Sequence, residues 1–316
     1  MPPDDVLPPS LPDDCALASR GLHEPLLGTA PEARGWIAVE QPGAWGRDAF
    51  AGSQLPAEVA AHLAAATEGT GVRPQVLRRP GRDDTPHATV VLLASSLPGA
   101  TWMERLELDD PRELLDVDPR LALRADPPGL GAPVDGPALL VCAHARRDAC
   151  CARWGRPVGA ALASIHADAT WETSHTGGHR FAANLVVLPE GLVYGGLDPQ
   201  RALEVVATHR RGLVDLDVLR GRSSLPRAAQ AADWFVRERM ALRGIDDVVV
   251  GNPSAPRGDG IVTVTASVPE ADVAVALSLR LAPTGTARPV SCGADPEDPG
   301  RWELLGFTPT GRARTS

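Results

Sequence analysis

The chain has 316 residues, 43% of them hydrophobic, and a formal net charge of −9 at pH 7. These values are typical of a globular protein that is large enough for two domains. The acidic balance argues against a general nucleic-acid binder. No apolar run reaches about 18 residues, so we expect no membrane span.

The first 14 residues contain five prolines and four acidic residues, a composition that predicts disorder. They lack the basic and apolar regions of a signal peptide. The five cysteines of a chain without such a leader are expected to be reduced thiols, which predicts a cytoplasmic protein.

The first half of the chain alternates predicted strands and helices. A helix is predicted over residues 55–67, with a proline in its first turn, and another over 111–123. Apolar or alternating segments predict strands at 35–40, 75–79, 88–95 and 102–108. A run rich in proline and glycine, residues 125–137, then predicts a domain boundary.

The second half has a clearer order of elements. Residues 138–143 (ALLVCA) predict a buried strand, and a helix with Pro157 in its first turn is predicted over 156–167. The elements expected next are a strand at 170–174, hairpin strands at 184–188 and 192–194, and a helix at 199–208. This is the thioredoxin-like order, and the first half has a similar one. Further on, a helix is predicted over 228–242 and two strands over 261–268 and 273–279, whose role stays unassigned.

Residue types that bind metals concentrate between positions 142 and 179. Cys142, Cys150 and Cys151 come first, and His175 and His179 follow within the sequence HTGGH. Thiolates and imidazoles at two separated places are typical of a metal site. The two glycines between the histidines predict a tight turn rather than a helical HExxH pattern.

Two thiolates and two imidazoles suit either a tetrahedral zinc ion or an iron–sulfur cluster. Structural zinc sites usually space their cysteines by about two to four residues. Here Cys142 and Cys151 are nine residues apart, and the side chains of the adjacent Cys150 and Cys151 should point apart. This spacing favours a group larger than one ion, such as a [2Fe–2S] cluster with one iron on each pair of ligands.

Two motifs in this stretch closely resemble the sucrase/ferredoxin-like family, which is related to thioredoxin-like [2Fe–2S] ferredoxins and includes the fungal actin-patch-distal proteins. Residues 142–151 match the family motif C-x-H-x-x-R-D-x-x-C, and residues 175–184 match H-x-G-G-H-x-F-A-x-N. Upstream, residues 28–30 (GTA) and 40–46 (EQPGAWG) resemble the opening of the family. The likeness covers roughly residues 15–240.

The resemblance implies a [2Fe–2S] cluster held by two cysteines and two histidines. Its register points to Cys142, Cys151, His175 and His179, with Cys150 as the alternative to Cys151. Together with the order of elements, it predicts an α/β protein with a thioredoxin-like ferredoxin fold. We expect two tandem thioredoxin-like domains, residues 14–125 and 136–222, with the cluster in the second, and an extension of a helix and a small β unit over 223–316.

Such a cluster would make the protein a carrier of single electrons, whose donor and acceptor proteins are unknown. The two cysteines are expected to hold a buried iron that stays ferric, and the two histidines an outer iron that takes the electron. The free ring nitrogens of the histidines would allow a proton to accompany it. His144, Arg147 and Asp148 are expected to support the ligands, the last two as an ion pair that orders the loop.

Two other classes of protein remain open. One is a zinc-stabilised binding module, and the other is a thiol–disulfide oxidoreductase that uses Cys150 and Cys151. The second is weakened by the absence of a C-x-x-C motif. No catalytic residue is predicted, and Cys15 and Cys292, which are remote in sequence, are interpreted as structural.

Overall fold

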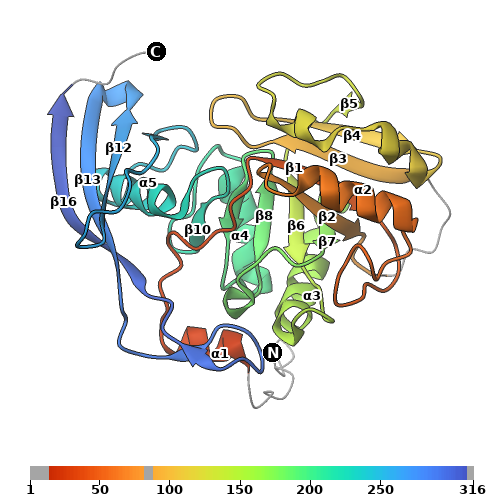
Figure 1. Ribbon diagram of the computed structural model, residues 1–316, viewed down its shortest axis with the longest axis horizontal. Coiled ribbons are helices and arrows are strands. Elements are labelled where there is room, and N and C mark those ends of the chain that lie inside the picture. The colour runs from red at the N-terminus through yellow and green to blue at the C-terminus, as the bar shows by residue number, and fades with distance from the viewer. Residues whose placement is uncertain (1–13, 82–87, 312–316) are drawn as a thin grey trace.

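The computed structural model describes residues 14–81 and 88–311 and is centred on a ten-stranded mixed sheet (Figure 1). Of the N-terminal segment expected to be disordered, residues 1–13 lie outside the described part of the chain. From one edge to the other, the strands are β10 (Leu219–Arg222), β9 (Leu192–Tyr194), β8 (Leu185–Leu188), β6 (Ala138–Cys142), β7 (Thr170–Thr173), β2 (Val72–Arg78), β1 (Gly35–Glu40), β3 (Thr89–Ser95), β4 (Trp102–Leu108) and β5 (Ala132–Pro133).

The two halves of this sheet have the same strand order and directions. In the first half, β2 is parallel to β1, β3 is antiparallel to β1, and β4 is antiparallel to β3. In the second half, β7, β6, β8 and β9 repeat this pattern. An antiparallel pairing of β2 with β7, in which Leu77 lies opposite Thr173, joins the halves. The similar order of elements expected in the two halves is therefore present, within one continuous sheet.

The sheet curls so that its two inner faces pack against each other. Ser96, just beyond β3, donates a hydrogen bond of 2.6 Å to the carbonyl oxygen of Pro189, just beyond β8, although four strands separate β3 from β8 in the sheet. Trp36 and Leu92 of the first half share one buried cluster with Leu140 of the second. Because strands such as β1 and β6 are buried on both faces, their sequences are continuous apolar runs rather than alternating ones.

Helices cover the two outer faces. The outer face of the first half packs against α2 (Ala57–Thr67) and the short 3-10 helices η1 (Pro111–Asp116) and η2 (Pro119–Leu123). The outer face of the second half packs against α3 (Ala149–Ala163) and α4 (Pro199–His209). None of the described helices is long and apolar enough to cross a membrane.

Two expected helices differ from the structure. The single helix predicted over 111–123 is two 3-10 helices, because Pro119 disfavours a helical conformation at the residue before it. The helix predicted over 156–167 begins at Ala149, where the Asp148 side chain accepts a hydrogen bond from the Cys150 amide at 2.9 Å. Pro157 therefore lies inside the helix. A proline at such a position destabilises a helix by about 3 kcal/mol, which the cap at Asp148 and the burial of the first turns offset.

The C-terminal part forms a second, smaller sheet of β11 (Val249–Val250), β12 (Ile261–Val268), β13 (Val273–Ala282) and β16 (Arg301–Gly311), in that order. Its buried face packs against α5 (Arg227–Met240), and the 3-10 helix η4 (Pro269–Ala271) joins β12 to β13. The helix and the two strands predicted there are confirmed.

The segment between β13 and β16 leaves this sheet and runs back to the N-terminal helix α1 (Cys15–Gly21), as Figure 1 shows. It contains the short strands β14 (Arg288–Pro289) and β15 (Pro296–Glu297). Arg288 forms an ion pair of 2.8 Å with Glu24, and both side chains are buried. We call residues 283–300 the returning segment, because it brings the C-terminal part of the chain to the edge of the second half.

Candidate metal centre

The structure brings Cys142, Cys151, His175 and His179 together. Cys142 ends β6, Cys151 lies in the first turn of α3, and the histidines lie in the loop between β7 and β8. The Nδ1 atom of His175 is 3.5 Å from Sγ of Cys151 and 3.9 Å from Sγ of Cys142. The rings of His175 and His179 stack, with centroids 4.6 Å apart. Residues from two strand ends and one helix start therefore meet in one place.

Gly155 allows α3 to approach β6 closely enough for this meeting. A Cβ atom at Gly155 would collide with the backbone carbonyl oxygen of Cys142. The helix therefore crosses the end of β6 in direct backbone contact, and Cys151, one turn earlier, reaches the sulfur of Cys142. Both cysteine side chains are buried.

The adjacent Cys150 faces a different side of α3. Its Sγ atom lies 3.1 Å from Sγ of Cys292 and 3.6 Å from Sγ of Cys15. Successive residues of a helix point about 100° apart, so one of the two adjacent cysteines can face Cys142 while the other faces away. The structure thus places Cys151, rather than Cys150, beside Cys142 and His175.

The tight turn predicted between the histidines is present. Gly177 and Gly178 have φ angles of 94° and 72°, which strongly favour glycine, and 3-10 helix η3 (His179–Phe181) follows. Arg220 donates to the Gly177 carbonyl at 3.0 Å, and Asn184 donates to the Gly178 carbonyl at 2.9 Å. A Cβ atom at Gly178 would collide with the Arg220 guanidinium. These contacts hold the histidine loop in a single shape.

His144 contacts the backbone of His175. Its Nε2 atom donates to the carbonyl oxygen of Gly46 at 2.6 Å, and its Nδ1 atom accepts a hydrogen bond from the His175 amide at 3.3 Å. Burial lowers the pKa of His144, so the ring stays neutral and can serve as both donor and acceptor. His144 therefore contacts the backbone of the histidine loop, and its role in supporting a metal ligand stays a prediction.

The expected ion pair between Arg147 and Asp148 is not formed. Arg147 is exposed, while Asp148 is buried as the N-terminal cap of α3. One oxygen of Asp148 accepts the Cys150 amide, and the other accepts the Cys292 amide at 3.0 Å. That second oxygen also lies 3.7 Å from Nδ1 of His179. The backbone amides in the first turn of a helix have no partner within the helix, and they stabilise a carboxylate more than an exposed arginine does. Asp148 therefore caps α3 instead of pairing with Arg147.

The electrostatics of the pair of sulfurs favour a thiolate at Cys142. Hydrogen bonds from Cys151 and His175 lower the pKa of Cys142 well below the ordinary thiol value. The same hydrogen bond, together with burial, raises the pKa of Cys151. Because the thiolate is the metal-binding form of cysteine, Cys142 is the better prepared of the two for a metal.

His179 has a buried ring nitrogen without a partner. Burial, and then the nearby His175, lower the pKa of His179 to about 4. Its Nδ1 atom is buried and has no hydrogen-bond partner among residues 14–81 and 88–311. A neutral imidazole with an unsatisfied buried nitrogen is chemically suited to bind a metal, since ligation would satisfy that atom.

The side chains around the loop form two overlapping groups that could hold a metal ion. Cys142, Cys151 and His175 make up one group, and Asp148, Cys151 and His179 make up the other. Within each group all ligand atoms lie within 4.8 Å of one another. The two groups share Cys151 and together contain all four ligands expected from the sequence.

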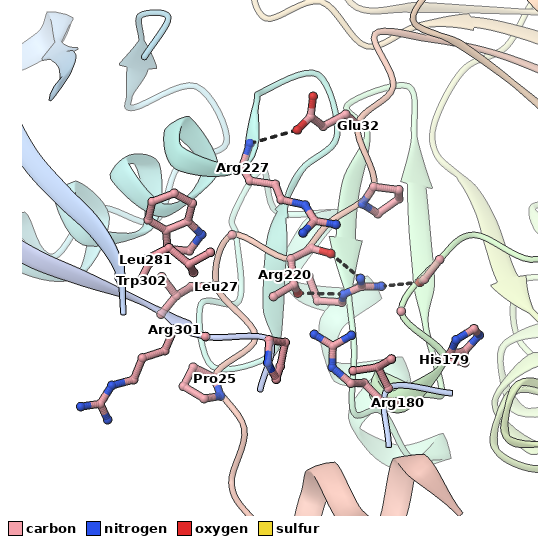
Figure 2. A pocket seen from close by; sticks show the side chains of 18 of the residues that line it. Pro25, Leu27, Glu32, His179, Arg180, Arg220, Arg227, Leu281, Arg301 and Trp302 are labelled. Atoms are coloured by element: carbon pink, nitrogen blue, oxygen red, sulfur yellow. Dashed lines mark hydrogen bonds between the residues drawn. The ribbon is translucent and has the colours of Figure 1, made fainter. Parts of the chain in front are cut away.

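A basic cavity of about 670 Å³ opens beside His179. Arg180, Arg220 and Arg227 converge on it, and His179 lies at its edge (Figure 2). Arg220 is fully buried, and burial lowers its pKa to about 9. Arg73, which also lines the cavity, donates to the His175 carbonyl at 3.2 Å and keeps a buried Nε atom without a partner among the described residues.

Sequence reasoning missed these arginines and Gly155. Arg220 donates from Nε to Oγ1 of Thr29 at 3.2 Å, so the upstream stretch GTA, which matched the opening of the family, contacts the histidine loop through it. In the sequence, this stretch was the one signal that could have pointed to Arg220. No local sequence pattern distinguishes a glycine that allows a close helix–strand contact, such as Gly155, from any other glycine.

The architecture and the site define an α/β protein with cysteine and histidine groups that could hold a metal ion. A family model described as sucrase/ferredoxin-like matches residues 26–221, which is more than half of the chain. The chain therefore belongs to the sucrase/ferredoxin-like family, as the motifs had indicated. No curated protein and no solved structure matches it.

Proposed function

We propose that this chain is a [2Fe–2S] protein that transfers single electrons, with Cys142, Cys151, His175 and His179 as cluster ligands. The observation that carries the proposal is the pair of overlapping groups that share Cys151. One ion needs a single compact set of ligands, whereas two metal atoms a short distance apart need two adjoining sets. The two cysteines and two histidines of these groups fit such a cluster in kind and in number, and Asp148 lies beside them as a fifth residue of a metal-binding type.

We further propose that the fold is that of a thioredoxin-like ferredoxin with two tandem units, residues 14–125 and 136–222, and an extension over 223–316. The recurrence of one strand order, β2-β1-β3-β4 and β7-β6-β8-β9, supports two related units. The pairing of β2 with β7 would be the interface between them. The cytoplasmic location expected from the sequence stays a prediction.

Residues of this chain would tune and shield the group. A bound [2Fe–2S] cluster supplies one-electron redox chemistry. Arg73 and Arg220 are buried cations within electrostatic range of Cys142 and would stabilise negative charge at the site. His175 and His179 each line a cavity and form the more open side, where unknown donor and acceptor proteins would approach.

Purified under anaerobic conditions with an ample iron supply, the protein should be red-brown, with about two irons and two sulfides per chain. The two-thiolate, two-imidazole set motivates this expectation. The measurements are visible absorption and elemental analysis. Colourless protein that contains zinc but no iron would reject the electron-transfer function.

A zinc-stabilised binding module is the second candidate. It is favoured by the compactness of Cys142, Cys151 and His175, whose ligand atoms alone could hold one tetrahedral ion. The elemental analysis decides between the two candidates. A thiol–disulfide oxidoreductase that uses Cys150 and Cys151 receives less support, because their sulfurs face different partners.

The reduction potential should fall as pH rises. The Nδ1 atoms of His175 and His179 face the sulfurs or lie buried, so Nε2 is the nitrogen left to carry a proton. Electron uptake raises the pKa of Nε2, so between the oxidised and reduced pKa values a proton accompanies the electron. Linkage then sets a slope of roughly −59 mV per pH unit for one proton per electron. The side chain of His179 is 16% exposed, which gives that proton access to water.

Protein-film voltammetry from neutral to alkaline pH would measure this slope. The control is His179→Cys, which removes one titratable ligand and should weaken the slope and lower the potential by adding negative charge. A flat line for the unchanged protein would exclude the proton-coupled mechanism.

A further inference from the structure

The three cysteines outside the candidate metal centre form a second cluster of thiols. Cys15 opens α1, Cys150 lies in the first turn of α3, and Cys292 lies in the returning segment between β14 and β15. Their Sγ atoms are separated by 3.1 Å for Cys150 and Cys292, 3.6 Å for Cys15 and Cys150, and 3.7 Å for Cys15 and Cys292. Segments more than a hundred residues apart therefore place three sulfurs in mutual contact.

These separations are close to those of a metal site. In a tetrahedral zinc site with Zn–S bonds of about 2.3 Å, the sulfurs lie about 3.8 Å apart. Two of the three observed separations agree with this value, and the third requires only a small side-chain shift. An oxygen of Asp148 completes the group, and all four ligand atoms lie within 4.8 Å of one another. We propose that Cys15, Cys150, Cys292 and Asp148 bind one zinc ion, with the three thiols bound as thiolates after loss of their protons.

The surroundings of the thiols suit such an ion. Three thiolates and one carboxylate around a divalent cation leave a net negative charge, which burial would penalise without compensation. Asp14 accepts a hydrogen bond of 3.0 Å from the Cys150 thiol, which zinc would replace as the thiol loses its proton, and Arg153 neutralises Asp14 through an ion pair of 2.9 Å. Arg20, which lies over the Trp154 ring, is a cation within electrostatic range of Cys150. Cys292 is only partly buried, which leaves an entry path for the metal.

The proposed zinc site would serve as a structural clamp. It ties the N-terminal helix and the returning segment to the helix that carries Cys151. Since the ion binds the folded chain and not the dispersed segments, it adds its binding free energy to stability. Asp148 lies within reach of both sites, but the two sites share no cysteine, so the inference rests on the contacts of Cys15, Cys150 and Cys292 alone and not on the proposed redox function.

The test is a comparison of metal content among variants made in medium that contains both iron and zinc. The full chain, Cys15→Ser, Cys292→Ser and Cys142→Ser would be purified anaerobically, freed of loosely bound metal on a chelating resin, and analysed by mass spectrometry of the elements. We expect about one zinc per chain in the unchanged protein. The zinc content should fall at least tenfold in Cys15→Ser and Cys292→Ser, while the iron content is unchanged. Cys142→Ser should lose iron and keep zinc. Ser164→Ala, at the exposed C-terminal end of α3 and away from both ligand sets, is the control and should keep zinc.

Zinc K-edge absorption of the unchanged protein adds a measurement that needs no variant to fold. Three sulfur neighbours at about 2.3 Å and one oxygen would support the proposal. Two sulfurs with nitrogen neighbours would mean that zinc occupies the site of Cys142 and His175 instead, and would overturn it. Zinc below a tenth of an equivalent, zinc retained in both cysteine variants, or a disulfide between Cys150 and Cys292 in the anaerobic protein would also overturn it.

Discussion

Replacing Cys151 with serine should remove the iron, whereas replacing Cys150 with serine should leave it bound. Sγ of Cys151 lies 3.5 Å from Nδ1 of His175, while Sγ of Cys150 contacts Cys15 and Cys292 on the other side of α3. Serine is a poor ligand for iron in a site of this kind, so loss of one thiolate should lower iron from about two atoms per chain to a small fraction. Iron analysis and visible absorption of both variants would measure the effect.

The pair of variants is well matched, because the two positions are adjacent and both are buried in the first turn of one helix. Serine at position 150 could still donate to Asp14, which accepts from the Cys150 thiol at 3.0 Å. The zinc content should show the opposite difference: Cys150→Ser should lose zinc, and Cys151→Ser should keep it. Iron retained in Cys151→Ser and lost in Cys150→Ser would move the ligand by one residue and reject the assignment.

Gly155→Ala should destabilise the fold and lower the iron content together. A Cβ atom at this position would collide with the carbonyl oxygen of Cys142. The atoms that it would meet all belong to the backbone, so no flexible side chain can move aside to relieve the collision. The helix must therefore shift relative to β6, which separates the two cysteines. Overpacking of this kind costs on the order of 3 kcal/mol. Denaturant unfolding and iron analysis would measure the two effects.

Gly159→Ala provides the control on the same helix. The nearest atoms to a Cβ at Gly159 belong to the side chains of Glu172 and Pro80, at 3.8 and 3.9 Å, which is ordinary contact. Alanine has the better helix propensity, so this variant should be unchanged or more stable by about 0.5–1 kcal/mol. Equal stability and iron content in the two variants would show that the contact between Gly155 and Cys142 does not position the site.

Secondary structure and the family were accessible from the sequence, because they depend on local patterns. Strands β1, β3 and β6 are continuous apolar runs, and α2 and α5 have helical periodicity, so their positions could be predicted. The start of α3 could not, since Pro157 resembles a first-turn proline and the cap at Asp148 depends on the fold around it. The motifs that span residues 142–151 and 175–184 lie within the stretch matched by the family.

The sequence by itself indicated which residues could hold a metal ion, because thiol and imidazole groups and the glycine turn are local properties. Only the tertiary structure decided which sulfurs meet. Adjacent cysteines on a helix face different directions, so Cys151 contacts His175 while Cys150 joins Cys15 and Cys292. The contacts of Cys150 join segments more than a hundred residues apart, and they depend on the path of the returning segment, which no local pattern in the chain encodes.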